Sequence, residues 1–213
     1  MSLMLIRHAQ SEHHIKDITG GWTDVALTEL GRRQAASLAA RLKRELAGVD
    51  VHIYTSDFKR ASQTAAMIGA ALGIEPTPVP CLREYNNGMA AGKTKAEAEA
   101  FARPLQGAIL DWQPYPEAET WREFYIRTTT CVEGLVEKHE EPVLIVTHQG
   151  TIINTIVWWL QLGMGALSKV SFHTAPASIS VLKFNEWKEL AIERLNDIGH
   201  LYADGLVEAV CYF

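Results

Sequence analysis

Two arginines, two histidines and one glutamate stand after short apolar runs of this sequence, where the chain turns from buried to exposed. Guanidinium groups offer paired donors that match phosphate oxygens, and a neutral imidazole can attack phosphorus. A carboxyl group can give a proton to a departing oxygen. This combination of residue types predicts transfer of a phosphoryl group. Its members are Arg7, His8, Arg60, Glu84 and His148.

The hydrophobic pattern indicates which elements position these side chains. Residues 3–7, 51–56 and 143–148 are short apolar, partly β-branched runs, which are typical of buried parallel strands. Between them lie amphipathic segments, and a late pair of runs at 178–184 and 188–195 reads as a hairpin. Helices are predicted over 27–46 with Thr28 as N-cap, over 59–72 ending at Gly73, and over 120–139 and 151–162.

This alternation predicts an α/β fold, a three-layer αβα arrangement with a mostly parallel central sheet. Residues 85–119 break the pattern and are expected to form a helical and then Trp/Pro-rich insertion over the active-site edge of the sheet. The carboxyl ends of parallel strands lie on one side of a sheet, so the five side chains should converge there. We expect a single domain over residues 1–213, with the insertion acting as a cap at about 85–119.

Composition limits the possible partners. The chain has 213 residues, 47% of them hydrophobic, and a net charge of −5, so we expect a globular protein without a basic face for nucleic acid. No apolar run approaches the roughly 20 residues that span a bilayer, and the N-terminus lacks a signal-peptide pattern. We therefore expect a cytoplasmic protein with neither nucleic acid nor a membrane as partner. The hairpin edge or the insertion could each carry a homodimer contact.

The three cysteines are widely spaced and odd in number, and their spacing matches no metal site. Reduced thiols are therefore expected at Cys81, Cys131 and Cys211.

Other chemical readings of the sequence are less favoured. No i,i+4 pair joins His8, His13 and His14 on a helix, and no Cys or carboxylate completes a zinc set, so no metal site is predicted. His13 is expected to be a solvated loop residue. The aromatic residues near the insertion could belong to the core or line a substrate pocket, and they are Trp112, Tyr115, Trp121 and Tyr125.

Six motifs occur in one order along the chain from residue 5 to about 201: RHAQSE, GWTDVALTELG, YTSDFKRASQTA, LREYNNGMAAGKT, VTHQG and LNDIGHL. Together they resemble the histidine phosphatase superfamily, in its phosphoglycerate-mutase-like branch. The resemblance implies that His8 is the phosphorylated nucleophile and Glu84 the proton donor, and that Arg7, Arg60 and His148 hold the phosphoryl group. It also implies no metal and no organic cofactor.

Several positions depart from the family pattern. Ala9 replaces the usual Gly, His14 stands where Asn is common, and Gln149 follows the second histidine in place of Gly. The mutase branch carries an Arg-Arg pair in the insertion for a substrate carboxylate, whereas this chain has a lone Arg103. A phosphatase is therefore favoured over a mutase. The further residues expected to bind substrate or phosphate are Ser11, His14, Thr23 and Gln149.

The predicted function is hydrolysis of a small phosphorylated metabolite by a metal-independent phosphomonoesterase, through a phosphohistidine on His8. Two alternatives stay open. The first is a phosphoglycerate-type phosphomutase, suggested by the GWTD motif at 21–24 and by Lys95. The second is a catalytically weak domain that binds a phosphorylated ligand.

Overall fold

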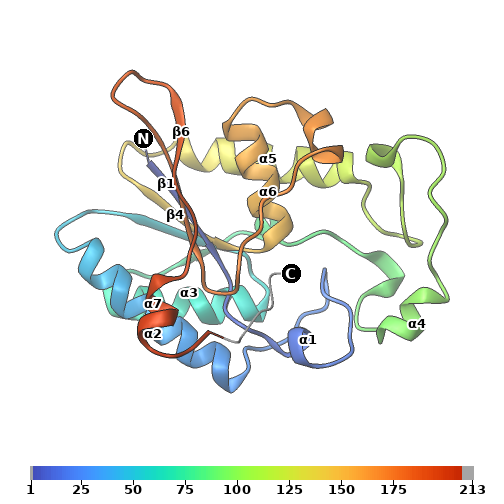
Figure 1. Cartoon of the computed structure of the whole chain (residues 1–213), viewed down its shortest axis with the longest axis horizontal. Helices are drawn as coiled ribbons and strands as arrows, with labels where there is room; N and C mark the ends of the chain where they lie inside the picture. Colours follow the sequence, from blue (N-terminus) through green and yellow to red (C-terminus); the bar gives the residue numbers. More distant parts are fainter. Residues whose placement is uncertain (1, 208–213) are drawn as a thin grey trace.

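The protein was analysed as a computed structural model, which describes residues 2–207; Cys211 and the prediction made for it lie outside these residues. A six-stranded sheet in the order β3-β2-β4-β1-β5-β6 runs through the molecule (Figure 1). The strand pairs β1–β4, β2–β4 and β2–β3 are parallel, while β5 and β6 form the predicted antiparallel hairpin beside β1. The strands are β1 (Ser2–Arg7), β2 (His52–Thr55), β3 (Thr77–Pro78), β4 (Val143–Thr147), β5 (Ile179–Phe184) and β6 (Leu190–Asp197).

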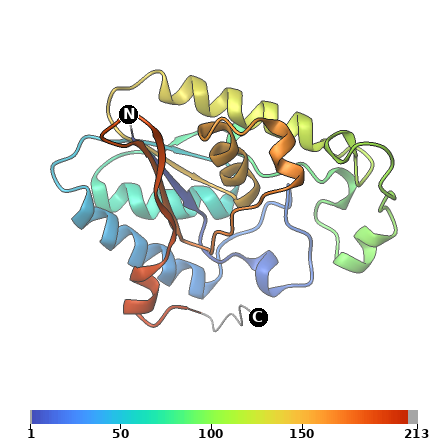
Figure 2. The same cartoon turned by 45° about the horizontal axis from the view of Figure 1, so that its top comes forward.

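Helices cover both faces of this sheet, which confirms the predicted three-layer α/β fold (Figures 1 and 2). The helices α2, α3 and α7 lie on one face, and α5 and α6 lie on the other. Their bounds are α2 (Glu29–Glu45), α3 (Lys59–Leu72), α5 (Trp121–Val136), α6 (Gln149–Trp159) and α7 (Gly199–Ala203).

Side chains of the central strands alternate between the two layers, because successive residues of a strand point to opposite faces. In β1, Met4 and Ile6 belong to the apolar cluster under α2 and α3, whereas Leu3 and Leu5 belong to the cluster under α5 and α6. The sheet is therefore buried on both faces, which explains the unbroken apolar runs in the sequence.

The predicted ends of two helices are confirmed. The Thr28 side chain accepts a hydrogen bond from the N–H of Gly31 at 2.9 Å, which caps α2. The helix α3 ends at Gly73, whose φ of 74° lies in the left-handed region that suits glycine.

The insertion at 85–119 extends to one side of the sheet and contains little regular structure (green in Figure 1). It contains one five-residue helix, α4 (Lys95–Glu99), so the helical part is shorter than predicted. Thr94 caps the start of this helix, with its hydroxyl accepting the N–H of Glu97 at 3.1 Å, and the turn at Gly92 precedes it. The remaining short elements of the described chain are α1 (Glu12–Ile15), η1 (Pro80–Leu82), η2 (Gly88–Ala90), η3 (Ile109–Asp111) and η4 (Met164–Ser168).

Strand register brings the carboxyl ends of three strands to one level. Arg7 at the end of β1 pairs with Thr147 at the end of β4, and Thr55 of β2 pairs with Val146. The residues that follow these positions therefore leave the sheet side by side.

Cys81 and Cys131 form a disulfide, so the prediction of reduced thiols was wrong for this pair. They lie 50 positions apart in sequence, but η1 lies against α5, and the two Cα atoms are 6.0 Å apart. Sequence spacing alone gives no sign of this contact.

Within residues 2–207, no helix is both long and apolar enough to cross a membrane.

Candidate active site

His8 is buried at the carboxyl end of β1, and one of its ring nitrogens is hydrogen-bonded to the backbone. Its Nδ1 lies 2.8 Å from the carbonyl oxygen of Ala9. A carbonyl only accepts, so Nδ1 carries the proton and Nε2 carries the lone pair. Burial, followed by the positive charge of Arg60, holds the pKa of His8 well below its usual value near 6.5. The imidazole is therefore neutral at pH 7, with Nε2 available as a nucleophile.

Arg60 is almost completely buried, and three of its donors are engaged by the protein. Nη1 donates to the carbonyl of Thr23 at 2.6 Å and Nη2 to that of Gly21 at 2.7 Å. Nε donates to Nδ1 of His148 at 3.2 Å. A guanidinium has five N–H groups, so two remain for a ligand. Burial lowers the pKa of Arg60 to about 10, which still leaves it charged at neutral pH.

His148 lies behind Arg60, fully buried at the end of β4. Because its Nδ1 accepts from Arg60, its Nε2 carries the proton and donates to the Ser56 hydroxyl at 2.8 Å. Burial holds its pKa well below the usual value, so the ring is neutral.

Arg7 is held less completely than Arg60. Nη1 donates to the carbonyl of Thr174, and Nη2 lies 3.1 Å from Nε2 of His14. His14 also receives the N–H of Ser11 at Nδ1, at 3.0 Å. A neutral imidazole has a lone pair on only one nitrogen, so it can satisfy only one of these two donors. Nε of Arg7 is buried without a partner in the structure. An anion beside Arg7 would satisfy these donors.

Glu84 is fixed through both its carboxyl group and its backbone. Oε1 accepts the N–H of Tyr85 and Oε2 accepts the N–H of Gly150, each at 3.0 Å. The Glu84 carbonyl accepts from the indole N–H of Trp22 at 2.8 Å and from Nη2 of Arg127 at 3.1 Å.

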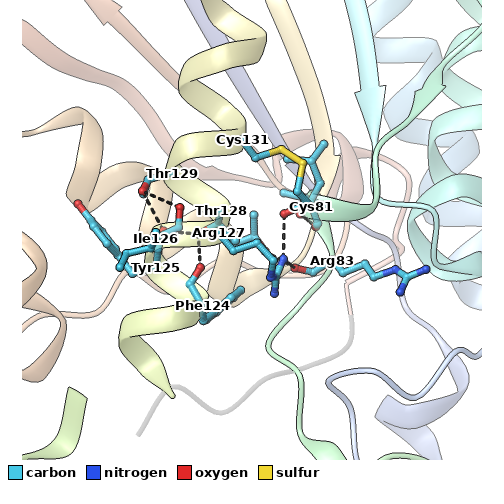
Figure 3. Close-up of a disulfide and its surroundings, with 12 residues drawn as sticks. Cys81, Arg83, Phe124, Tyr125, Ile126, Arg127, Thr128, Thr129 and Cys131 are labelled. Atoms are coloured by element: carbon cyan, nitrogen blue, oxygen red, sulfur yellow. Dashed lines mark hydrogen bonds between the residues drawn. A yellow bond between two sulfur atoms is a disulfide. The ribbon is translucent and has the colours of Figure 1, made fainter. Parts of the chain in front are cut away.

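The segment that carries Glu84 is fastened to α5 at two places. Figure 3 shows Cys131 bonded to Cys81 and, one helical turn earlier, Arg127 pointing to the same segment. Nη1 of Arg127 donates to the carbonyls of Cys81 and Arg83 at 2.9 and 3.1 Å. Nε of Arg127 forms an ion pair with Oε1 of Glu119 at 2.6 Å. Arg127 is a positioning residue that the sequence analysis missed, since nothing marks it among the arginines of an amphipathic helix.

A cavity of about 510 Å³ opens over these residues, and we call it the phosphate cavity. Four of the five predicted catalytic residues line it, whereas His148 does not. The lining includes Arg7, His8, Arg60, Glu84 and Gln149.

The other predicted binding residues lie around this cavity. Gln149 lines it, while Ser11 and Thr23 are buried outside it. The Ser11 hydroxyl contacts Nδ1 of His13 at 2.9 Å, and the Thr23 hydroxyl accepts the N–H of Gly92 at 2.8 Å. His14 does not line the cavity, but it contacts Arg7 and lies beside the rings of His8 and His13, which do.

The positions of several side chains were predicted wrongly or left open by the sequence. His13 lines the phosphate cavity, so its prediction as a solvated loop residue was wrong; the short helix α1 turns it inward. Tyr115 and Trp121 also line the phosphate cavity, and Trp112 lines a neighbouring one. Tyr125 lines a separate pocket with Trp158.

His8, His13 and His14 place ring nitrogens within 4.8 Å of one another, a convergence that sequence spacing did not predict. Such a set could hold a metal ion by geometry alone. Burial is the main reason why the pKa values of all three rings are lowered, and the positive charges of Arg7 and Arg60 beside them lower these values further. The same charge disfavours a cation and favours an anion.

Comparison with known proteins identifies the class of this site. A sequence profile of the histidine phosphatase superfamily (branch 1) matches residues 3–198. The chain therefore belongs to this superfamily, as the motifs predicted.

Individual relatives extend the match over almost the whole chain. A Hydrogenobacter thermophilus protein named as a phosphoserine phosphatase is 33% identical over 203 residues, covering 93% of this chain and 96% of the relative. Phosphoglycerate mutase-like protein 4 of Arabidopsis thaliana is 27% identical over 213 residues, covering 97% and 90%. The solved structure of a mycobacterial glucosyl-3-phosphoglycerate phosphatase with VO3 has a TM-score of 0.76 at 26% identity, covering 92% and 98%. The fold and the prediction of a phosphoric monoester hydrolase are thus supported by relatives.

Proposed function

We propose that this protein is a phosphomonoesterase that works through a phosphohistidine on His8. The observation that carries the proposal is the neutral, buried His8 with a free Nε2, placed in one cavity with Arg7, Arg60 and Glu84. The two guanidinium groups would hold the phosphate oxygens and stabilise the charge of the transition state.

The first step is an in-line displacement at phosphorus. Nε2 of His8 forms a bond to phosphorus while the bond to the ester oxygen breaks, and Glu84 gives its proton to that oxygen. The N–H at Nδ1 stays bonded to the Ala9 carbonyl, which stabilises the positive charge that the ring gains.

The second step returns the enzyme to its first state. A water molecule attacks phosphorus, Glu84 takes a proton from it, and the bond between phosphorus and Nε2 breaks. Inorganic phosphate leaves, His8 is neutral again, and no electrons change hands. Because His148 holds Nε of Arg60 at 3.2 Å, we assign it to positioning Arg60.

The test is hydrolysis of an aryl phosphate in the presence of a chelator, with His8→Ala beside the intact protein. We expect chelator-resistant activity that His8→Ala lowers by at least about a thousandfold, while His52→Ala at the other end of the sheet leaves it unchanged. An acid-labile phosphoryl label on the intact protein should be absent from His8→Ala. Full activity of His8→Ala would overturn the proposal.

A phosphomutase is the second candidate, supported by the mutase-like relative. The basic residues that a mutase could use to hold a substrate carboxylate, Lys95 and Arg103, do not line the phosphate cavity. Lys95 forms an ion pair with Asp17 at 3.3 Å, and Arg103 donates a hydrogen bond to Gln113 at 2.7 Å. Phosphoglycerate isomerisation stimulated by a diphosphorylated primer would favour the mutase. A phospho-ligand sensor is the third candidate, and turnover of any phosphomonoester at useful rates would remove it.

Three finer expectations complete the proposal: one domain with a cap at 85–119, a homodimer, and a cytoplasmic location. Sedimentation gives the oligomeric state, and cell fractionation gives the location. A disulfide is unusual in the reducing cytoplasm, so the location should be measured together with the thiol content of protein taken directly from cells.

A further inference from the structure

A second cavity, of about 300 Å³, adjoins the phosphate cavity, and we call it the annex. The two cavities share Trp121, Gly150 and Ile153 in their walls, so a ligand can extend from one into the other. The annex is completed by the insertion and by the segment after α6. These parts contribute Ile109, Leu110, Trp112, Leu167 and Val170.

None of the described residues that line the annex carries a charge. The polar side chains in its wall are Asn154 and Ser171, and Asn154 already donates its amide to Thr128 at 3.0 Å. An apolar group that enters the annex leaves water for matching surroundings. A carboxylate would lose its hydration without gaining a cation, which is strongly unfavourable.

Glu84 stands at the junction of the two cavities. It lines the phosphate cavity, and its Oε2 accepts the N–H of Gly150, a residue of both walls. The ester oxygen must lie beside Glu84 to receive a proton, while the phosphoryl group faces Arg7 and Arg60. The carbon atoms attached to that oxygen are then directed past Gly150, toward the annex.

We propose that the annex binds the alcohol part of the substrate and selects phosphomonoesters of uncharged, largely apolar alcohols over esters whose alcohol carries a carboxylate. This proposal rests on the proposed phosphatase function. It also explains why apolar Ile109 and Val170 stand more than a third exposed at this place, since substrate would cover them.

The test compares two substrates that differ only at the far end of the alcohol. Hexyl phosphate and 6-phosphonooxyhexanoate have leaving groups of similar basicity, so a difference in kcat/KM reports binding of the chain and not the chemistry at phosphorus. We expect hexyl phosphate to be preferred by at least about tenfold.

Val170→Lys places a cation at the annex. Val49→Lys makes the same change at a site of similar exposure elsewhere: Val49 is 42% exposed and Val170 is 40% exposed. Val170→Lys should reduce the preference at least about fivefold, by slowing hexyl phosphate and favouring the carboxylate. Val49→Lys should leave the preference unchanged.

The outcomes separate the phosphatase function from the role of the annex. If neither these esters nor the aryl phosphate is hydrolysed, or if hydrolysis survives in His8→Ala, the phosphatase function itself is refuted. If the aryl phosphate is hydrolysed through His8 but hexyl phosphate is not, only the proposal for the annex is overturned. If both esters are hydrolysed through His8 at equal kcat/KM, or if Val170→Lys and Val49→Lys behave alike, the annex does not bind the alcohol and only this further inference is overturned.

Discussion

Gly150 and Glu84 are in contact so close that no side chain fits between them. The Gly150 N–H donates to Oε2 of Glu84 at 3.0 Å, and a Cβ at position 150 would lie 2.4 Å from Oε1. It would also lie 2.8 Å from Cε1 of Phe124, a fully buried ring. The glycine is needed here for space, and the place of the proposed proton donor depends on it.

Gly150→Ala should therefore displace the Glu84 carboxyl group. We expect kcat for alkyl phosphates to fall about a hundredfold, because their leaving oxygen needs a proton, and kcat for activated aryl phosphates to fall much less. Gly134→Ala in α5 is the matched control, since its Cβ would meet nothing within 4 Å. Equal losses on both substrate types would show that Glu84 does not supply the proton.

Arg127 should influence the same step without touching substrate. Arg127→Met removes the donors that hold the carbonyls of Cys81, Arg83 and Glu84. We expect a loss in kcat of roughly tenfold for alkyl phosphates, with little change in KM and a smaller loss for aryl phosphates. Arg33→Met changes an exposed arginine of α2, far from this segment in the sequence, and should be silent. A loss that is independent of the leaving group would indicate general destabilisation instead.

His8 should stay neutral in mild acid. Burial and Arg60 lower its pKa, so the neutral form persists as pH falls through 6.5. Nitrogen-detected NMR should show the Nδ1–H tautomer from pH 7.5 to 5.5, and Arg60→Gln should raise the pKa. Below about pH 6.5 the His8 side chain takes up a proton in the unfolded chain but stays neutral in the folded protein. The free energy of unfolding should therefore decline as the pH falls below that value. Uptake of a proton by folded His8 between pH 7 and 6 would contradict this.

The disulfide should contribute to stability by restricting the conformations open to the unfolded chain. It closes a loop of 50 residues, so the Cys81→Ser/Cys131→Ser double variant should lose about 2–4 kcal/mol of unfolding free energy in urea titrations. A reducing agent should destabilise the intact protein by a similar amount and leave the double variant unchanged. If the reducing agent has no effect on the intact protein, the bond is not formed in solution.

The sequence predicted the strands and helices well because their signals are local. The apolar run at 143–148 and the cap at Thr28 each depend on neighbouring residues. The convergence of Arg7, His8, Arg60 and Glu84 also followed, since parallel strands must end on one side. A single inference from topology thus located most of the candidate site.

The features that were missed depend on long-range contacts. Cys81 and Cys131 meet only because η1 lies against α5, and Arg127 finds its carbonyl acceptors in the same place. His13 turns inward because of a four-residue helix, which is too short to leave a clear periodic signal. In the insertion the helical pattern corresponds to a helix of only five residues, and the annex depends on how the irregular remainder packs against α5 and α6, which the sequence does not indicate.

The walls that belong to the annex alone and the proposed phosphate-binding residues come mostly from different parts of the chain. Arg7 and His8 lie at the end of β1 and Arg60 in the first turn of α3, whereas Trp112, Leu167 and Val170 belong to connecting segments. Mutations in the connecting segments can thus change the alcohol that is accepted while the sheet and the phosphorus chemistry stay intact. Such a division allows new substrate preferences to evolve in small steps, each of which leaves a working enzyme.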